Sequence, residues 1–316
     1  MPLLLLFPGQ GSQKPSMAKD LVAVFPAARR VFDEADAALG ASLSTLCFEG
    51  PAEELTRTHN AQPALLVHGA AVWAVVQERA AAHVVGAAGH SLGEFSAYHA
   101  ASALSLTDAV RLVRRRGELM FETGQARPGA MAAILGELQR PIEDICAEAS
   151  AAGIVVPANY NAVEQVVISG EVAGVERGME LAKLAGAKRT VRLQVSGAFH
   201  SPLMQPAQAG LETALGAAQW RVSRWPVYSN VTAAAVSDAA VARDLLLRQL
   251  TSPVRWVEVI RTMAAAHPDA TFVEMGPGNV LTGLLKRLAP GHVARTCGTV
   301  AEVEALLSSL KLQTKL

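Results

Sequence analysis

Cysteine is scarce in this 316-residue chain, and this scarcity excludes one class of protein. The three cysteines, Cys47, Cys146 and Cys297, lie far apart and show no metal-ligand spacing. A structural disulfide framework uses more cysteines in a shorter chain. The sequence therefore predicts a reducing compartment with free thiols. We expect each cysteine to be a small buried apolar residue rather than a nucleophile.

The sequence also lacks an excess of charge and a long apolar run. Lys plus Arg and Asp plus Glu each number 28, so the formal net charge is zero and no broad field favours nucleic acid or a membrane. The opening stretch Leu3–Phe7 follows no basic leader and is too short for a signal or a span. Elsewhere polar residues interrupt every apolar run, which predicts a cytoplasmic protein.

What the sequence does contain is typical of an enzyme with a large core. Hydrophobic residues make up 51% and charged residues 18%, which argues against disorder. A chain of this length suffices for one large α/β domain or two smaller ones.

The most informative stretch is Gly89-His90-Ser91-Leu92-Gly93-Glu94, which follows the apolar residues 81–88. A buried strand that runs through Gly-x-Ser-x-Gly into a helix predicts a nucleophile elbow, with the serine on a strained turn. The two glycines allow the tight turn and close packing. The backbone N–H after the serine would point at an oxyanion. Five residues alone also fit an ordinary strand-to-helix loop.

Apolar periodicity predicts an α/β fold. The elbow motif is typical of α/β-hydrolases, so we expect a large α/β-hydrolase-like subdomain built on a parallel sheet, at residues 1–126 and 198–316. We expect its strands at 3–7, 81–88, 227–229, 271–274 and 293–296. We expect its helices at 17–24, 61–79, 93–101, 107–123, 239–250, 255–266 and 300–310, with others following 201 and 280. Thr107 is the predicted N-cap of the helix that carries Arg111, Arg114, Arg115 and Arg116.

The rhythm of the sequence changes at residues 127–197. Strands are expected at 131–135, 154–158, 165–169 and 190–195, and helices at 142–151 and 172–185. This β-α-β-β-α-β order is ferredoxin-like, so the segment is predicted to be a small inserted subdomain.

A catalytic serine needs a base, and the chain offers eight histidines. His90 adjoins Ser91, but its side chain should point away at a tight turn, so we assign it a packing role. His200 follows a predicted strand and lies where the two subdomains meet, where clefts are common. Position alone leaves its role open. The remaining six lie beside helices or in turns and are expected to be ordinary histidines: His59, His68, His83, His99, His267 and His292.

Two further features could serve a ligand. Gln10 lies in a glycine-containing loop directly after the first strand, at the sheet edge where α/β proteins form their sites. Lys14 replaces the third glycine of a dinucleotide-binding motif, so we discount that function. Of the four arginines on the expected helix 107–123, three are expected on a solvated face and one can turn inward.

Four separated stretches together resemble the malonyl-CoA:acyl carrier protein transacylase family. They are 7–13 (FPGQGSQ), 89–94 (GHSLGE), 116–120 (RGELM) and 197–204 (GAFHSPLM), and further similarity runs through 159–161, 165–170, 248–250 and 274–278. The resemblance covers nearly the whole chain in the family's order. Asn279, Val163 and the polar residues Tyr98, His99 and Ser102 depart from the family's usual pattern, and none of these departures removes a catalytic group.

The resemblance implies a role for each site residue. Ser91 would form a malonyl ester and His200 would act as general base and acid. The amides of Gln10 and Leu92 would form the oxyanion hole, and the Gln249 carbonyl would orient the histidine. Arg116 would bind the malonyl carboxylate, while Phe199 would leave no room for an α-methyl group in the pocket.

The implied reaction is a ping-pong transfer from malonyl-CoA to the phosphopantetheine thiol of an acyl carrier protein, for fatty-acid or polyketide synthesis. It needs no metal and no other cofactor, because CoA and phosphopantetheine belong to the substrates. We expect a monomer. Two alternatives remain: a serine esterase or thioesterase of the α/β-hydrolase type, and a non-catalytic module that docks a carrier protein.

Overall fold

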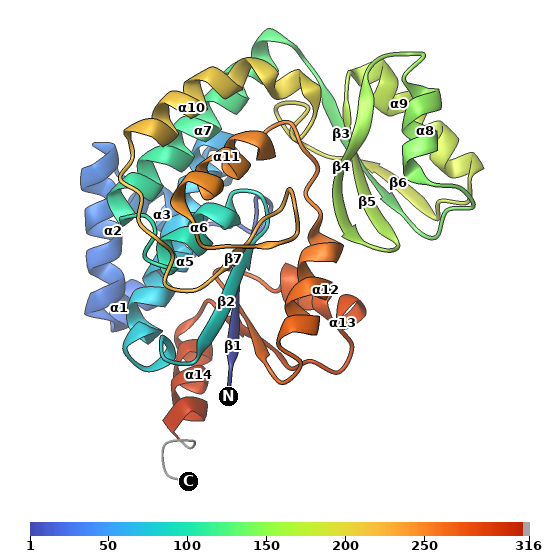
Figure 1. Ribbon diagram of the computed structural model, residues 1–316. Helices are drawn as coiled ribbons and strands as arrows, with labels where there is room; N and C mark the ends of the chain where they lie inside the picture. The colour runs from blue at the N-terminus through green and yellow to red at the C-terminus, as the bar shows by residue number, and fades with distance from the viewer. Residues whose placement is uncertain (312–316) are drawn as a thin grey trace.

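The computed structural model describes residues 1–311, so the last five residues of the predicted range 198–316 lie outside it. Two β-sheets organise the chain, and each has its own helices and its own core (Figure 1). The four-stranded sheet is built entirely from residues within the segment 127–197 that the sequence singles out. The α/β fold with a large subdomain and a smaller inserted one is therefore confirmed.

The larger sheet has the strand order β10-β9-β1-β2-β7-β8, and all its pairings are parallel except the one between β7 and the edge strand β8. Its strands are β1 (Leu3–Phe7), β2 (Val84–Gly89), β7 (Val227–Tyr228), β8 (Ala235–Val236), β9 (Thr271–Met275) and β10 (Ala294–Cys297). β1 lies at its centre between β2 and β9. A central parallel strand is covered on both faces, which explains why every residue of β1 is buried.

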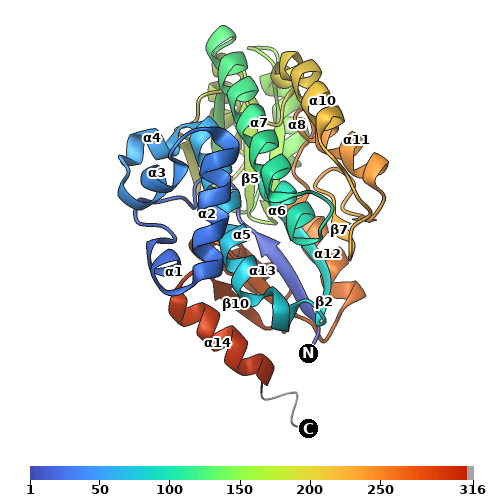
Figure 2. The same ribbon diagram turned by 90° about the vertical axis from the view of Figure 1, so that its left-hand side faces the viewer.

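Alternate residues of β1 belong to two different hydrophobic cores. Leu3, Leu5 and Phe7 join the helices on one face of the sheet, whereas Leu4 and Leu6 join those on the other. The first face is covered by α2 (Pro26–Leu39), α5 (Thr58–Ala80), α6 (Gly93–Ala100), α7 (Leu106–Ala126) and α14 (Val300–Lys311), and the second by α12 (Trp256–Ala266) and α13 (Val280–Leu288). The N-terminal helices and α14 wrap the first face (Figure 2).

Several helices depart from the sequence-based expectations. The expected elements omit α2, α3 (Leu43–Glu49) and α4 (Ala52–Thr56), and the first helix α1 is short, at Lys19–Val24. The predicted cap of α7 is wrong: Ser105 is its N-cap, and its hydroxyl accepts a hydrogen bond from the Asp108 amide. Thr107 instead donates its hydroxyl to Glu34. The large subdomain also contains α10 (Gln208–Ala217) and α11 (Ala239–Gln249), with the 3-10 helix η1 (Pro202–Ala207) before them.

The smaller sheet is antiparallel, with the order β4-β5-β3-β6, and α8 and α9 pack against it. Its elements are β3 (Ala130–Leu135), α8 (Ile142–Ala149), β4 (Val155–Ala162), β5 (Gln165–Gly170), α9 (Val172–Leu184) and β6 (Arg189–Arg192). β4 is longer than expected because its end is bound to the large subdomain: the Tyr160 amide donates to the Val254 carbonyl and the Val254 amide to that of Ala158.

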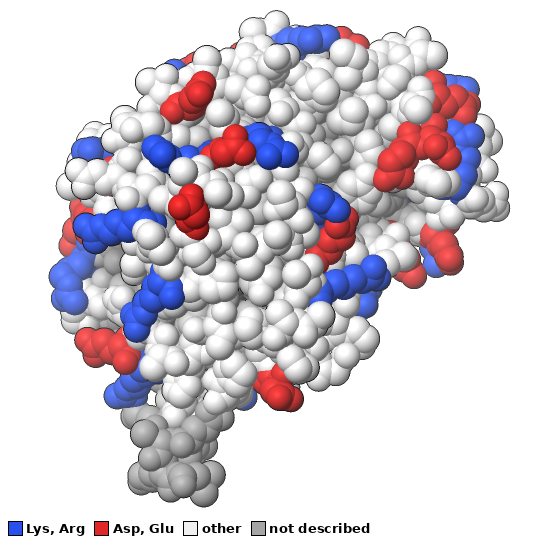
Figure 3. All heavy atoms as spheres, viewed as in Figure 1, with Lys and Arg blue, Asp and Glu red and all other residues white. Residues whose placement is uncertain are grey.

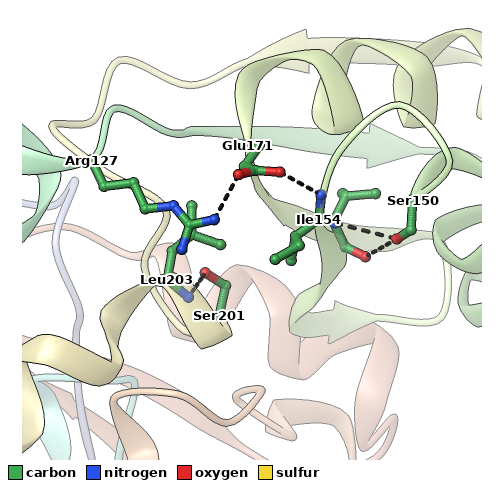
Figure 4. A network of polar contacts seen from close by, with 7 residues as sticks. Arg127, Ser150, Ile154, Glu171, Ser201 and Leu203 are labelled. Atoms are coloured by element: carbon green, nitrogen blue, oxygen red, sulfur yellow. Dashed lines mark hydrogen bonds and ion pairs between the residues drawn. The ribbon is translucent and has the colours of Figure 1, made fainter.

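Polar contacts fix the two places where the chain crosses between subdomains (Figure 4). Arg127, just after α7, forms an ion pair with Glu171, whose other carboxylate oxygen accepts the Ile154 amide. On the return crossing, the Ser201 hydroxyl donates to the Ala198 carbonyl and accepts the Leu203 amide. The hydrogen bond from the Leu203 amide to Ser201 caps the start of η1, directly after His200, and so fixes the backbone next to that histidine.

The surface agrees with the balanced composition. On the face shown in Figure 3, lysine and arginine side chains alternate with aspartate and glutamate, and no field of one sign covers it. Cys47, Cys146 and Cys297 are free and buried, and burial raises the pKa of each thiol to about 12. No helix within residues 1–311 combines the length and the apolar character that crossing a membrane requires.

Candidate active site

Ser91 lies on a strained turn between β2 and α6, as the motif predicts. Its φ is 52°, in the left-handed region that non-glycine residues rarely occupy. Its amide donates to the Asn230 side-chain oxygen over 2.7 Å. Strained backbone of this kind costs about 1–3 kcal/mol and clusters at functional sites.

The two glycines of the motif are needed for close packing. A Cβ on Gly89 would lie 1.9 Å from the carbonyl carbon of Gly93, and a Cβ on Gly93 would lie 2.2 Å from the Phe7 carbonyl oxygen. Neither position has room for a side chain. The elbow thus packs directly against the end of β1, where Gln10 follows.

His200 contacts the serine directly. Its Nε2 lies 2.8 Å from Ser91 Oγ, and its Nδ1 lies 2.9 Å from the Gln249 carbonyl oxygen. An Nδ1–H that donates to this carbonyl leaves Nε2 as the acceptor for the serine proton. His200 also has a positive φ, of 57°. Both members of the pair are therefore held in uncommon backbone conformations by the surrounding fold.

Burial and the charge of Arg116 lower the pKa of His200 to about 3. The imidazole is therefore neutral at physiological pH, the form that can accept a proton from Ser91. Among the described residues its ring nitrogens contact Ser91 and the Gln249 carbonyl rather than a carboxylate, so the pair differs from a Ser-His-Asp triad.

Arg116 is the arginine of α7 that turns inward. It is 1% exposed, and its guanidinium donates to Ser91 Oγ over 3.0 Å, to the Gln249 side-chain oxygen over 3.0 Å and to the Gln62 side-chain oxygen over 2.7 Å. Its Nε has no partner among the described residues. A buried cation with a donor to spare is suited to a carboxylate.

A cavity of about 280 Å³ opens onto these groups between the two subdomains. The large subdomain contributes Gln10, Ser91, Arg116 and His200, and the small subdomain contributes residues of β3, β4 and 193–195. The predicted pocket residue Phe199 lines the cavity and is 5% exposed. Gln249 is not among the residues that line the cavity, and it joins the site through its contacts with His200 and Arg116.

Two backbone amides belong to residues that line the same cavity as Ser91. Those of Leu92 and Gln10 have no hydrogen-bond acceptor within residues 1–311, and both residues line the cavity. Leu92 immediately precedes α6, whose N-terminus favours negative charge. This pair of free donors is the kind of arrangement that stabilises an oxyanion.

Sequence reasoning missed several residues of the site. Asn230 accepts the Ser91 amide and donates to the Gly89 carbonyl, while Gln62 supports Arg116. Asn230 stands just beyond the carboxyl end of β7, next to the elbow strand, so its position in sequence was an available signal. Gln62 lies within a long apolar helix, and no feature of the sequence there indicates a role in the site.

Two other histidines have partners away from Ser91. His90 points its Nε2 to the Asn161 side-chain oxygen, 2.7 Å away, which joins the elbow to β4 of the small subdomain. His68 is buried and bonded to the Gly298 carbonyl. Within residues 1–311, no three His, Cys, Asp or Glu side chains are grouped so as to hold a metal ion.

This fold and this serine-histidine-arginine site define an acyl transferase domain, and the family model of that description matches residues 4–308. The chain is 47% identical over 313 residues to the malonyl CoA-acyl carrier protein transacylase of Bacillus subtilis strain 168, covering 99% of this chain and 96% of that protein. It is 41% identical to the Escherichia coli K12 protein of the same name, and the match covers 97% of this chain and 98% of that protein.

Solved structures agree. An acyl-carrier-protein-S-malonyltransferase from Bartonella henselae superposes with a TM-score of 0.94 at 43% identity, covering 98% of this chain and all of that one. A malonyl-transacylase solved in complex with a type II PKS acyl-carrier protein superposes with a TM-score of 0.93 at 39% identity. This match also covers 98% of this chain and all of that one. The chain belongs to the family of malonyl CoA-acyl carrier protein transacylases.

Proposed function

We propose that this protein transfers a malonyl group from malonyl-CoA to the phosphopantetheine thiol of an acyl carrier protein, through a malonyl ester on Ser91. One observation carries the proposal: Ser91 Oγ contacts both the neutral base His200, at 2.8 Å, and the guanidinium of Arg116, at 3.0 Å. The first contact serves acylation, and the second selects an acyl group that bears a carboxylate. The product would supply fatty-acid or polyketide synthesis.

In the first half-reaction, Ser91 Oγ attacks the thioester carbonyl while His200 Nε2 takes the hydroxyl proton. The amides of Leu92 and Gln10 donate to the oxyanion. The imidazolium then gives its proton to the leaving CoA sulfur. Because Nδ1 donates to the Gln249 carbonyl, the ring keeps its orientation through both proton transfers.

In the second half-reaction the carrier-protein thiol takes the place of CoA. His200 accepts the thiol proton, the sulfur attacks the ester carbonyl, and the proton returns to Ser91 Oγ as the ester bond breaks. Arg116 holds the malonyl carboxylate meanwhile. CoA and phosphopantetheine enter as parts of the substrates, so the proposed reaction uses no metal and no redox cofactor.

Labelling and transfer assays distinguish this function from the two alternatives, a thioesterase and a docking module. We expect labelled malonyl-CoA to place the label on the peptide that contains Ser91, and holo-carrier protein to remove it, whereas the apo-carrier protein, which lacks the thiol, leaves it in place. Ser91→Ala should lower label incorporation by about 10⁴-fold or more. Release of free malonate faster than transfer would indicate a thioesterase. Binding of carrier protein without any acylation would indicate a docking module.

A further inference from the structure

A second buried charge lies behind Arg116. Glu94, in the first turn of α6, is 0% exposed. One of its oxygens accepts the Asn230 amide over 3.0 Å and the Gln249 side-chain nitrogen over 2.8 Å. Its other oxygen has no partner among the described residues. A buried carboxylate that is only half satisfied is costly for a fold to keep, so its retention calls for a reason beyond packing.

Gln249 connects this carboxylate to the arginine. Its side-chain nitrogen donates to Glu94, and its side-chain oxygen accepts from Arg116 Nη2 over 3.0 Å. The two charges therefore hold the amide in one orientation and attract each other across it. Burial raises the pKa of Glu94 to about 7, and it lowers the pKa of Arg116 to about 10, while their mutual attraction opposes both shifts.

We propose that Glu94 is the counter-ion of Arg116 in the unloaded protein and takes up one proton from solvent when a malonyl carboxylate pairs with Arg116. This inference rests on the proposed function. In the unloaded site one carboxylate balances one guanidinium. A bound malonyl carboxylate makes a second anion in the same buried site. Protonation of Glu94 restores neutrality, and its unpartnered oxygen is the place for that proton.

The other titratable groups near Glu94 are poorly placed to take the proton. Burial and the charge of Glu94 raise the pKa of the Tyr98 hydroxyl, which is therefore already protonated. His90 has its pKa lowered by burial. His200 faces the same arginine and is the one competitor, because a bound carboxylate offsets the charge that lowers its pKa. Proton uptake measured in His200→Ala distinguishes Glu94 from His200 as the group that takes up the proton.

The test measures proton uptake on binding without chemistry. Ser91→Ala is titrated with malonyl-CoA at about pH 8 in buffers of different ionisation enthalpy, with CoA as the control ligand. A carboxyl group with a pKa near 7 is about 90% ionised there, so we expect about 0.9 proton to be taken up with malonyl-CoA beyond any taken up with CoA. The malonyl-CoA Kd should rise about tenfold per pH unit above that pKa.

Two further variants on the Ser91→Ala background locate the proton. Glu94→Gln keeps an acceptor for the Asn230 amide and should abolish both the uptake and the pH dependence of Kd. Glu274→Gln alters a buried carboxylate outside the site and should retain both. If Glu94→Gln does not fold, infrared difference spectra of the Ser91→Ala protein, with and without malonyl-CoA, should still show a new protonated carboxyl band.

The outcomes are distinct. Equal proton uptake with CoA and malonyl-CoA overturns the proposal, as does uptake that persists in Glu94→Gln or that disappears in His200→Ala instead. Failure of the proposed function is recognised separately, since the protein with its native serine would then form no malonyl ester.

Discussion

Two strand-to-helix corners flank the end of β1, and each follows a strand that pairs with it. The first joins β2 to α6 through residues 90–92, and the second joins β9 to α13 through residues 276–279. Both lie at the carboxyl edge of the parallel strands of the same sheet, and a buried glutamate stands beside each: Glu94 in α6 and Glu274 in β9. The first corner brings Ser91 within hydrogen-bond distance of a base, His200, and a cation, Arg116.

The two glutamates explain the difference. Glu274 accepts the amides of Leu281 and Thr282 over 3.0 and 2.8 Å, one on each oxygen, at the N-terminus of α13. Its partners are backbone groups that the helix fixes, so it stabilises the corner. Glu94 is instead joined through the Gln249 side chain to Arg116. A carboxylate tied to fixed amides supports structure, whereas one joined to a charged side chain can respond to a ligand.

Among changes that test the difference between the two corners, we expect His200→Ala to have the largest effect, on the rate of Ser91 acylation. Loss of a positioned general base lowers the rate of such steps by about 10²- to 10⁴-fold. Rapid-quench measurement of Ser91 acylation by malonyl-CoA provides the rate. The hydrogen bonds of the His200 ring go to Ser91 and Gln249, outside the second corner, so the variant should fold with α13 intact. An unchanged acylation rate would remove His200 from its proposed role.

A smaller effect is expected from Arg116→Ala. Loss of one partner from a buried, hydrogen-bonded charge pair costs about 2–5 kcal/mol, so kcat/KM for malonyl-CoA should fall about 30-fold or more. Transfer from acetyl-CoA, which has no carboxylate, should not fall with it. Arg115→Ala is the matched control, because Arg115 lies on the same helix and its ion pairs with Glu118 and Glu122 are exposed. A preserved preference for malonyl-CoA in Arg116→Ala contradicts the assignment.

The smallest effects compare one glycine from each corner. Gly93→Ala places a Cβ 2.2 Å from the Phe7 carbonyl oxygen, so backbone must move, and we expect the free energy of unfolding to fall by about 3 kcal/mol. Gly278→Ala meets no atom within 4 Å, but the φ of Gly278 is +87°. Strain alone should then cost about 1–2 kcal/mol. Urea denaturation measures the free energy of unfolding of each variant. Equal decreases in the two variants would show that the elbow is no more tightly packed than the second corner.

Much of the fold followed from local pattern. The apolar run of β1, the elbow motif and the β-α-β-β-α-β order each reflect backbone periodicity that neighbours in sequence determine. Helices α2, α3 and α4 were missed. The N-cap of α7 was wrong because Ser105 and Thr107 both suit a cap, and contacts with Asp108 and Glu34 decide between them.

The sequence by itself determined the residue types of the site and the strained turn that bears Ser91, because a turn depends on a few adjacent residues. Only the tertiary structure decided that Glu94, Gln249 and Arg116 form one chain of contacts, since they come from three helices that meet behind the elbow. The charge of such a buried group depends on what surrounds it in space, and the order of residues along the chain does not contain that information.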